Sequence, residues 1–264
     1  IGEGTPTRKE LIQVDLSFVY KCTKEILKYT KKKKIIITKS TVPVGTGDEI
    51  DKIIKKKKKL FSIISNPEFL REGEAIRDFR YPDRIVIGSD NKNEFKTMRK
   101  LYSPLISKGA KFFTTSRKGA ELIKYASNAF LATKITFINE LANLCEKTGI
   151  NVEDISLGIG SDSRIGGRFL RAGPAYGGSC FPKDTKGLVS AAEKHKTNLS
   201  IVKSVINSNN KRVSLLTERV HSILGKSLKN KKISILGVTF KPNTDDMRDS
   251  TSLKMIPYYC KSGA

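Results

Sequence analysis

The stretch 117–148 constrains the fold of this 264-residue chain more than any other feature. It contains no proline, and its apolar residues, among them Leu122, Phe130, Phe137 and Leu144, recur at helical spacing. Gly149 follows and suits the position just beyond a helix C-terminus. A helix of this length would extend about 48 Å, more than one small domain needs. The pattern therefore predicts a helix that bridges two domains or forms a subunit interface.

Ahead of this helix, four short apolar runs alternate with helical patterns. The runs at 35–38, 61–65, 84–88 and 111–114 predict buried strands, and the helical patterns cover 16–27, with Asp15 as N-cap, 48–54 and 94–105. Strands of near-continuous apolar character that alternate with helices are typical of a mostly parallel sheet. We therefore expect an α/β unit over 1–115.

Behind the long helix, the sequence predicts a helical unit over 116–212. A glycine-rich loop is expected from Gly158 to Gly178, followed by helices at 182–195 and 199–224. The apolar run 232–236 ends at Gly237 and predicts a buried strand. Residues 213–264 would thus hold the end of a linking helix and the start of another α/β unit.

The chain is strongly basic. Lysine and arginine number 50 against 26 acidic residues, which gives a net charge of +24 and makes a nucleic-acid-binding protein the alternative from another class. Two lysine runs, 31–34 and 55–59, carry much of the charge, and each directly precedes an apolar run. Neither run is interleaved with aromatic residues that could stack on bases. We therefore interpret both runs as solvated surface and expect no specific nucleic-acid partner.

The four cysteines and two histidines are scattered, with no C-x-x-C pair. Their spacing predicts neither a disulfide framework nor a metal site. No apolar run reaches the roughly 20 residues of a membrane span, and the first residues do not form a signal segment. We expect a cytoplasmic protein with no bound metal and no membrane partner.

The segment 177–184, with the sequence GGSCFPKD, carries the strongest indication of chemistry. Pro182 suits the first position of the following helix, which would place Cys180 just outside the positive end of that helix. A thiolate is favoured there, and the two preceding glycines would let a ligand approach the sulfur closely. Cys180 is therefore a candidate nucleophile, and an inert small residue in a loop is the alternative.

Three further segments place polar side chains where a ligand could bind. Lys124 and Asn128 lie four residues apart and would share one helix face, where they could stabilise an oxyanion; an exposed polar stripe is the alternative. The segments 40–43 and 66–72 each follow a predicted strand, so their side chains, including Glu68 and Glu72, would lie at the carboxyl edge of the sheet. Ordinary turn chemistry is the alternative for both segments.

The sequence contains no complete nucleotide-binding glycine loop. The G-x-G pairs that begin at residues 2, 45 and 158 lack the third glycine of G-x-G-x-x-G, and no G-x-x-x-x-G-K-[ST] pattern occurs. The usual pyrophosphate cradle is therefore missing from this sequence.

Six segments, taken in order, carry a resemblance to a known family. They are GTPT at 4–7, STVPVG at 40–45, NPEFLREG at 66–73, ELIKYASNA at 121–129, GGSCFPKD at 177–184, and GVTFKP at 237–242 with RDS at 248–250. Together they resemble the nucleotide-sugar 6-dehydrogenases, the UDP-glucose/GDP-mannose dehydrogenase family. PDRIVIG at 82–88 and DSRIG at 162–166 are more similar to the UDP-glucose branch than to the GDP-mannose or UDP-N-acetylmannosamine branches.

The resemblance implies an architecture of three parts. Residues 1–115 would be the C-terminal part of an incomplete, Rossmann-like, NAD-binding parallel-sheet domain, and 116–212 a central all-helical dimerisation domain. Residues 213–264 would be a linking helix and the start of a second Rossmann-like domain, which binds UDP. The long helix would form the core of a homodimer. The chain would then be a fragment that lacks both ends of the family's proteins, and we expect it to be inactive alone.

The resemblance also implies a reaction, the NAD-dependent four-electron oxidation of UDP-glucose to UDP-glucuronate. Cys180 would form a thiohemiacetal and then a thioester, Asp184 would assist proton transfer, and Lys124 and Asn128 would stabilise the oxyanion. Thr41, Glu68 and Glu72 would order water and sugar. The resemblance assigns further residues as follows: Glu68, Phe69, Leu70, Glu72, Lys124, Asn128, Arg164, Phe169, Arg171, Tyr176, Gly177 and Lys241 to the sugar nucleotide, and Thr41, Glu72, Cys180, Lys183 and Arg248 to the cofactor.

Overall fold

The computed structural model describes residues 14–55 and 59–264. The GTPT segment at 4–7 and residues 56–58 of the second lysine run lie outside the described residues. The chain forms two compact units, Ile1–Ser127 and Asn128–Ala264. In the described residues, the first unit holds a sheet and the second is helical.

The sheet of the first unit has four strands in its described part. They are β1 (Lys34–Thr38), β2 (Phe61–Ser65), β3 (Arg84–Gly88) and β4 (Lys111–Thr115), in the order β1-β2-β3-β4. The β1–β2 and β3–β4 pairs are parallel, as expected, whereas β2 and β3 meet antiparallel at Ser65 and Gly88. The α/β class is confirmed, but the sheet is mixed. Strand direction depends on the path of the connecting segment, which an apolar run does not encode.

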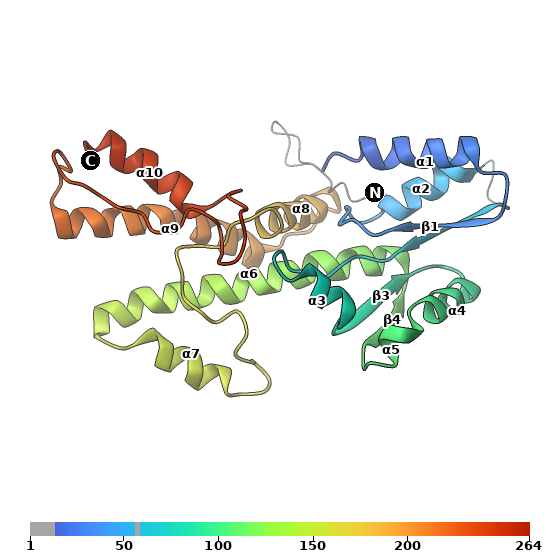
Figure 1. Cartoon of the computed structure of the whole chain (residues 1–264), viewed down its shortest axis with the longest axis horizontal. Helices are drawn as coiled ribbons and strands as arrows, with labels where there is room; N and C mark the ends of the chain where they lie inside the picture. The colour runs from blue at the N-terminus through green and yellow to red at the C-terminus, as the bar shows by residue number, and fades with distance from the viewer. Residues whose placement is uncertain (1–13, 56–58) are drawn as a thin grey trace. The chain divides into compact units, whose positions relative to one another are not determined.

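Helices cover the strands of this sheet, and Figure 1 shows α1 (Ser17–Tyr29) and α2 (Thr46–Ile54) beside β1, and α4 (Lys92–Leu101) and α5 (Ser103–Ile106) beside β4. Ile63 of β2 packs with residues of α1 and α2, and its neighbour Ile64 packs with residues of α4 and α5. Successive residues of a strand point to opposite faces, and here both faces are buried. Near-continuous apolar strands therefore suit this position.

Several helix boundaries differ from expectation for local reasons. The N-cap residue of α1 is Leu16 and not Asp15 as predicted, although the Oδ1 of Asp15 accepts the N–H of Ser17 at 2.9 Å. The helix expected at 94–105 is instead two helices, α4 and α5, separated at Tyr102. Pro104 at the start of α5 has no N–H to continue the first helix. The short helix α3 (Ala75–Arg80) was not predicted, because its six residues are too few to show a helical repeat of apolar residues.

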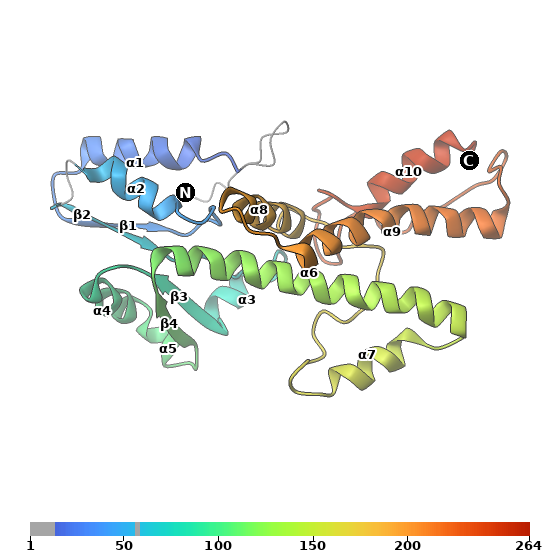
Figure 2. The ribbon, with the colours of Figure 1, turned by 180° about the vertical axis from the view of Figure 1, so that it is seen from behind.

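In the helical part, α6 (Arg117–Thr148) has the predicted bounds and continues through the division between the two units. Helices α8 (Phe181–Lys194) and α9 (Ser200–Leu224) begin and end within one residue of their predicted bounds. Helix α9 packs against α8 and against α10 (Thr251–Lys261), as Figure 2 shows. Helix α10 was not predicted, and it contains Pro257, which in sequence reads as a helix breaker.

The expected glycine-rich loop begins later than predicted. Gly158 and Gly160 lie inside α7 (Val152–Gly160), so the prediction of a loop from Gly158 was wrong at its start. The Oδ1 of Asn151 accepts the N–H of Glu153 at 3.0 Å and caps this helix. The cap offsets the low helix propensity of the two glycines.

The prediction of a buried strand at 232–236 was wrong. No strand occurs among residues 128–264, and Leu236 is 97% exposed. A strand needs a neighbour to share its backbone hydrogen bonds, and the described part of the chain offers none to this segment.

Close packing of β3 against α6 leads to a stability prediction. A Cβ at Gly88 would lie 2.6 Å from the Cβ of Ala120 and 2.7 Å from the carbonyl oxygen of Ser116. Gly88→Ala should therefore lower the free energy of unfolding by about 1–3 kcal/mol through overpacking. The matched control is Gly158→Ala in α7, where a Cβ meets nothing within 4 Å and should raise stability by about 0.5–1 kcal/mol. Urea unfolding followed by circular dichroism measures both, and a neutral Gly88→Ala would contradict the packing.

Candidate active site

Cys180 is the N-cap residue of α8 and is exposed. Phe181 and Pro182 form the first two helical positions, so Pro182 lies one position further in than predicted. The first N–H groups of a helix have no partner within it and carry partial positive charge. The sulfur therefore lies beside the end of α8 that favours an anion.

One turn into α8, Asp184 is buried with only 1% of its surface exposed. The Nδ2 of Asn128 on α6 donates to its Oδ2 at 2.5 Å, and the Nζ of Lys183 lies 3.5 Å from its Oδ1. Asn128 itself is 6% exposed, as is Lys124. The alternative of an exposed polar stripe on α6 is therefore wrong.

The two glycines before the cysteine lie against a segment far along the chain. A Cβ at Gly177 would lie 2.5 Å from the carbonyl oxygen of Asp249, and one at Gly178 would lie 2.7 Å from the ring of Phe240. The N–H of Gly178 donates to the carbonyl oxygen of Arg248 at 2.8 Å. Any side chain at 177 or 178 would separate these two segments, which explains why the sequence has glycine at both positions.

Polar side chains of α6 and α9 that were not predicted as site residues bind the backbone just upstream of Gly177. Asn209 on α9 accepts from the N–H of Tyr176 at 2.9 Å and donates to its carbonyl oxygen at 3.1 Å. Asn139 on α6 accepts from the N–H of Gly173 at 2.8 Å, and Arg212 on α9 donates to the carbonyl oxygen of Gly173 at 2.6 Å. Long helices contain many polar residues, and only the fold shows which of them bind this backbone.

Three aromatic rings gather next to this segment. The ring of Phe181 lies 6.1 Å from that of Tyr176, edge-on, and 6.2 Å from that of Phe169. Phe169 has a positive φ of 66°, unusual for a bulky residue. Two residues predicted to hold the sugar nucleotide, Phe169 and Tyr176, are thereby brought together by Phe181.

In the first unit, the segments after β1 and β2 leave the same edge of the sheet, as predicted. Thr38 and Ser65 are paired at the strand ends. Pairing continues past them, since the N–H of Asn66 donates to the carbonyl oxygen of Thr38 at 2.9 Å. Thr41 lies in the first segment and is 8% exposed, and Glu68 lies half-buried in the second.

Phe69 connects the second segment with helix α6. Its ring centroid lies 5.3 Å from the Nζ of Lys124 and 4.0 Å from the Cζ of Arg84. Arg84 also donates to the Oγ of Ser127 at 3.2 Å. Cations over an aromatic face are held by its quadrupole. Arg84 belongs to the motif at 82–88, but an arginine at this position did not by itself indicate contacts with Phe69 and Ser127.

Hydrogen bonds between Arg71 and Asp78, called the Arg71–Asp78 clamp below, join the 66–73 segment to α3. The guanidinium of Arg71 donates to both carboxylate oxygens of Asp78 on α3, at 2.6 and 3.0 Å, and the N–H of Arg71 donates at 2.8 Å. These hydrogen bonds lower the pKa of Asp78 below its ordinary value.

The other predicted site residues are exposed or half-buried, and their roles stay predictions. Arg164 pairs with Asp162 and has an 87% exposed side chain, and Arg248 pairs with Asp246. Lys241 lies over the ring of Phe240. The remaining ones are Leu70 and Arg171, which are exposed, and Glu72, which is half-buried.

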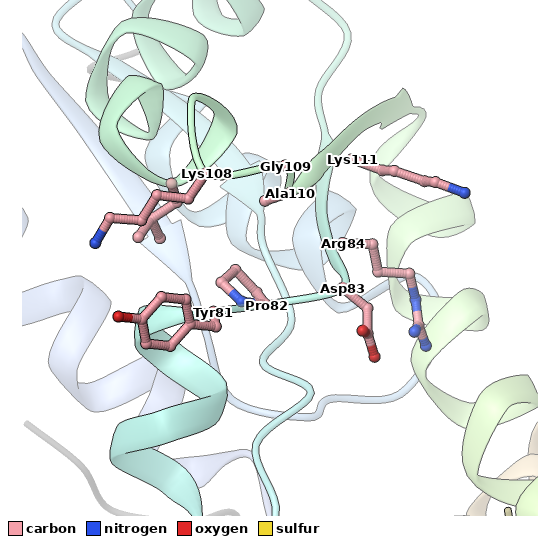
Figure 3. Close-up of a pocket in the computed structure, with 9 residues that line it drawn as sticks. Tyr81, Pro82, Asp83, Arg84, Lys108, Gly109, Ala110 and Lys111 are labelled. Atoms are coloured by element: carbon pink, nitrogen blue, oxygen red, sulfur yellow. The ribbon is translucent and has the colours of Figure 1, made fainter.

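A cavity of about 550 Å³ lies where β3 and β4 begin, and Arg84 is among the residues that line it. Figure 3 shows the side chains of Lys108 and Lys111 pointing in opposite directions, so its cations do not converge on one point. No group of three or more His, Cys, Asp and Glu side chains within the described ranges could hold a metal ion. Among the described helices, none is both long and apolar enough to cross a membrane.

Two models of one family match most of the chain. The NAD binding domain of the UDP-glucose/GDP-mannose dehydrogenase family matches residues 1–106, and the central domain of that family matches residues 118–211. The chain belongs to this family. Membership assigns the Cys180 segment and nearly all of α6 to the central domain of this dehydrogenase family.

Similar proteins of the family are longer than this chain. The UDP-glucose 6-dehydrogenase of Rhizobium meliloti (strain 1021) is 48% identical over 268 residues, which cover 100% of this chain and 61% of that protein. The UDP-glucose 6-dehydrogenase of Rickettsia prowazekii (strain Madrid E) is 51% identical, over 97% of this chain and 59% of its own length. A UDP-glucose dehydrogenase structure from the hyperthermophilic archaeon Pyrobaculum islandicum matches with a TM-score of 0.92 at 34% identity, over 99% of this chain and 61% of that one. The chain thus spans about 60% of these relatives.

The Arg71–Asp78 clamp predicts a pH dependence. Because the pKa of Asp78 is lower in the folded state, its stabilising contribution is present above the ordinary value of 3.8 and is lost as the pH falls through the lowered pKa. Asp78→Asn should therefore reduce the free energy of unfolding at pH 7, and the difference from wild type should shrink below about pH 4. Urea unfolding at a series of pH values measures this difference, and a difference that stays constant from pH 7 to pH 3 would contradict the clamp.

Proposed function

We propose that the protein containing this chain oxidises the C6 alcohol of UDP-glucose to the carboxylate of UDP-glucuronate with NAD⁺ as the hydride acceptor. The observation that carries the proposal is the start of α8. There the exposed Cys180 precedes by one helical turn the buried Asp184, which Asn128 binds at 2.5 Å. An accessible thiol beside a buried, oriented carboxylate suits attack on a carbonyl carbon followed by proton transfer.

The sequence relationships favour UDP-glucose as the substrate. Identity is 48–51% with two proteins named UDP-glucose 6-dehydrogenase. It is 28% with a GDP-mannose dehydrogenase from Pseudomonas aeruginosa, whose structure matches with a TM-score of 0.58. GDP-mannose and UDP-N-acetylmannosamine are the alternative substrates within the same reaction class.

The described residues fit part of the cofactor. Thr41 and Glu72 follow the carboxyl ends of β1 and β2, where open α/β sheets bind nucleotides. The N-terminus of α2 does not fit a pyrophosphate, because the carboxylate of Glu121 already accepts from the N–H groups of Gly45 and Gly47. Lys183 and Arg248 would supply positive charge to the cofactor, whose bound nicotinamide ring accepts hydride.

The first oxidation removes a hydride from C6 and a proton from its hydroxyl group, which yields an aldehyde. The Cys180 thiolate then forms a bond from Sγ to C6, and the carbonyl oxygen becomes an oxyanion. Lys124 and the second N–H of the Asn128 amide would stabilise that oxyanion. The product of this step is a thiohemiacetal.

Loss of the second hydride from C6 converts the thiohemiacetal to a thioester. Water attacks C6, the S–C bond breaks, and the carboxylate and the Cys180 thiolate are released. Asp184 would accept a proton through an intervening water, while Thr41 and Glu68 would order water and sugar. In balance, the alcohol and one water lose two hydrides and three protons.

The sugar nucleotide would be held mainly by side chains of the second unit. Phe169 and Tyr176, gathered around Phe181, offer apolar and stacking surface. Arg164, Arg171 and Lys241 would supply charge for the diphosphate, with backbone approach at Gly177. In the first unit, Phe69, Leu70 and Glu72 would contact the sugar.

We also propose the domain division 1–115, 116–212 and 213–264, which the family matches at 1–106 and 118–211 support.

The four cysteines are all unpaired, which supports a reducing, cytoplasmic location.

The partner proposed for this chain is a second copy, bound through α6. Phe130, Phe137 and Leu144 are spaced seven residues apart and are 65%, 51% and 58% exposed. A seven-residue apolar spacing keeps side chains on one side of a helix, where they pack against another helix.

The thiol proposal predicts complete dependence on one cysteine. In the intact protein, Cys180→Ala should lower kcat at least about a thousandfold, because the covalent intermediate cannot form. Cys260→Ala, which removes the other exposed cysteine, should leave kcat unchanged. NADH absorbance measures kcat of both variants, and the wild-type protein should form two NADH per UDP-glucose.

Turnover retained by Cys180→Ala would contradict the mechanism. Sequence-selective DNA binding by the wild-type protein without NADH formation would instead favour the nucleic-acid-binding alternative.

The dimer proposal predicts an effect of charge on the exposed stripe. Phe137→Asp should shift the dimer towards monomer by at least about tenfold in dissociation constant, because a charge would be desolvated at the interface. Glu218→Lys, at an exposed position of α9, is the control and should change the constant little. Sedimentation equilibrium measures both, and unchanged dimerisation of Phe137→Asp would contradict this interface.

A further inference from the structure

Glu121 is a buried carboxylate to which neither the resemblance nor the proposed mechanism gives a role. It lies on α6 one turn before Lys124 and is 3% exposed. A carboxylate removed from water is costly unless hydrogen-bond donors surround it. Its partners therefore show what it does.

Three donors from two other segments meet this carboxylate. The N–H of Gly45 donates at 2.6 Å, the N–H of Gly47 at 2.8 Å, and the Oγ of Ser65 at 3.0 Å. Burial raises the pKa of Glu121, and these three donors partly offset that rise. The carboxylate is thus held by groups that stabilise its charged form.

The two glycine N–H groups belong to the start of α2. Gly45 is the N-cap residue and has no side chain that could accept from the free N–H groups of the first turn. Glu121 supplies the missing acceptor from another helix, and its negative charge suits the positive end of α2.

The sequence is adapted to this contact at Gly47. A Cβ there would lie 3.0 Å from the Oε1 of Glu121 and 3.1 Å from the Oγ of Ser65. Gly45 has a φ of +97°, which a side chain would strain. Gly47 therefore allows the close approach of Glu121, and Gly45 allows the backbone turn whose N–H reaches it.

The anchored end continues directly into the segment that carries Thr41. Thr46 Oγ1 donates to the carbonyl oxygen of Pro43 at 2.6 Å, and the N–H of Thr46 donates to the same oxygen at 3.1 Å. Residues 43–46 are thereby folded into a turn at the start of α2, two residues after Thr41, and Glu121 fixes that start to α6. Lys124 follows Glu121 by three residues on the same helix and lies on the same side of it.

We propose that Glu121 is a positioning residue, whose carboxylate holds the Gly45–Gly47 turn against α6 and so sets the place of Thr41 relative to Lys124. The anchoring stands on the contacts alone, and its effect on turnover rests on the proposed function.

The anchoring is tested by Glu121→Gln. An amide in place of the carboxylate turns an N–H₂ group toward at least one of the two glycine N–H donors, whichever way it is oriented. The amides of Gly45 and Gly47 should then exchange with solvent at least about tenfold faster. Glu94→Gln is the matched control, since Glu94 on α4 is also buried and binds Ser89, and it should leave these amides unchanged. Unchanged exchange in Glu121→Gln would overturn the anchoring.

The effect on turnover is tested in the intact protein by a double-mutant cycle with Thr41→Ala. Glu121→Gln should lower kcat about 10–100-fold with little change in KM, because displaced groups lose transition-state contacts more than substrate binding. In the Thr41→Ala background the same change should cost less than about threefold, since the group that it positions is gone. If Glu121→Gln lowers kcat by the same factor in the wild-type and Thr41→Ala backgrounds, the positioning role is overturned.

Two further measurements separate the outcomes. If Glu121→Gln does not fold, Gly47→Ala tests the same contact sterically and should give the same exchange and kinetic effects, whereas wild-type behaviour of Gly47→Ala would overturn the proposal. If the wild-type protein reduces no NAD⁺ with any sugar nucleotide, the proposed function fails, and amide exchange still decides the anchoring by Glu121.

Discussion

The buried polar face of helix α6 is the constraint on which the proposed chemistry depends. Glu121, Lys124 and Asn128 recur at three- and four-residue spacing, and each is less than a tenth exposed. Such groups are unfavourable in a protein interior unless partners meet them. Glu121 meets the start of α2, Lys124 lies on the ring of Phe69, and Asn128 binds Asp184. The start of α2, Phe69 and Asp184 are thus each held by a contact that one of these buried groups requires.

Elements with a strong local pattern could be predicted from the sequence. The four strands and α6 were found within a residue of their bounds, because buried strands and long helices repeat their apolar residues regularly. Short or interrupted elements could not be predicted. Helix α7 depends on one cap at Asn151, α10 contains a proline, and the apolar run 232–236 is not a strand because strand formation requires a neighbour.

The candidate site was predictable to the extent that its chemistry lies in short segments. Cys180 was identified from its own neighbours in sequence, and the expected sharing of one helix face by Lys124 and Asn128 agrees with their common burial. Arg84 and Asn209 were missed, since their importance lies in what they contact: the ring of Phe69 and the backbone of Tyr176. A contact between residues far apart in sequence has no local signature in a single chain.

The packing of a later part of the chain against Gly177 and Gly178 has a consequence for biosynthesis. Phe240 and the Arg248–Asp249 backbone, which touch these glycines, are translated well after Cys180. During N-to-C synthesis the thiol emerges while its neighbouring backbone lacks the hydrogen bond to residue 248 and the ring that covers it. During that period the exposed Cys180 thiol lacks these neighbours, and oxidants or electrophiles near the ribosome could react with it before the fold is complete.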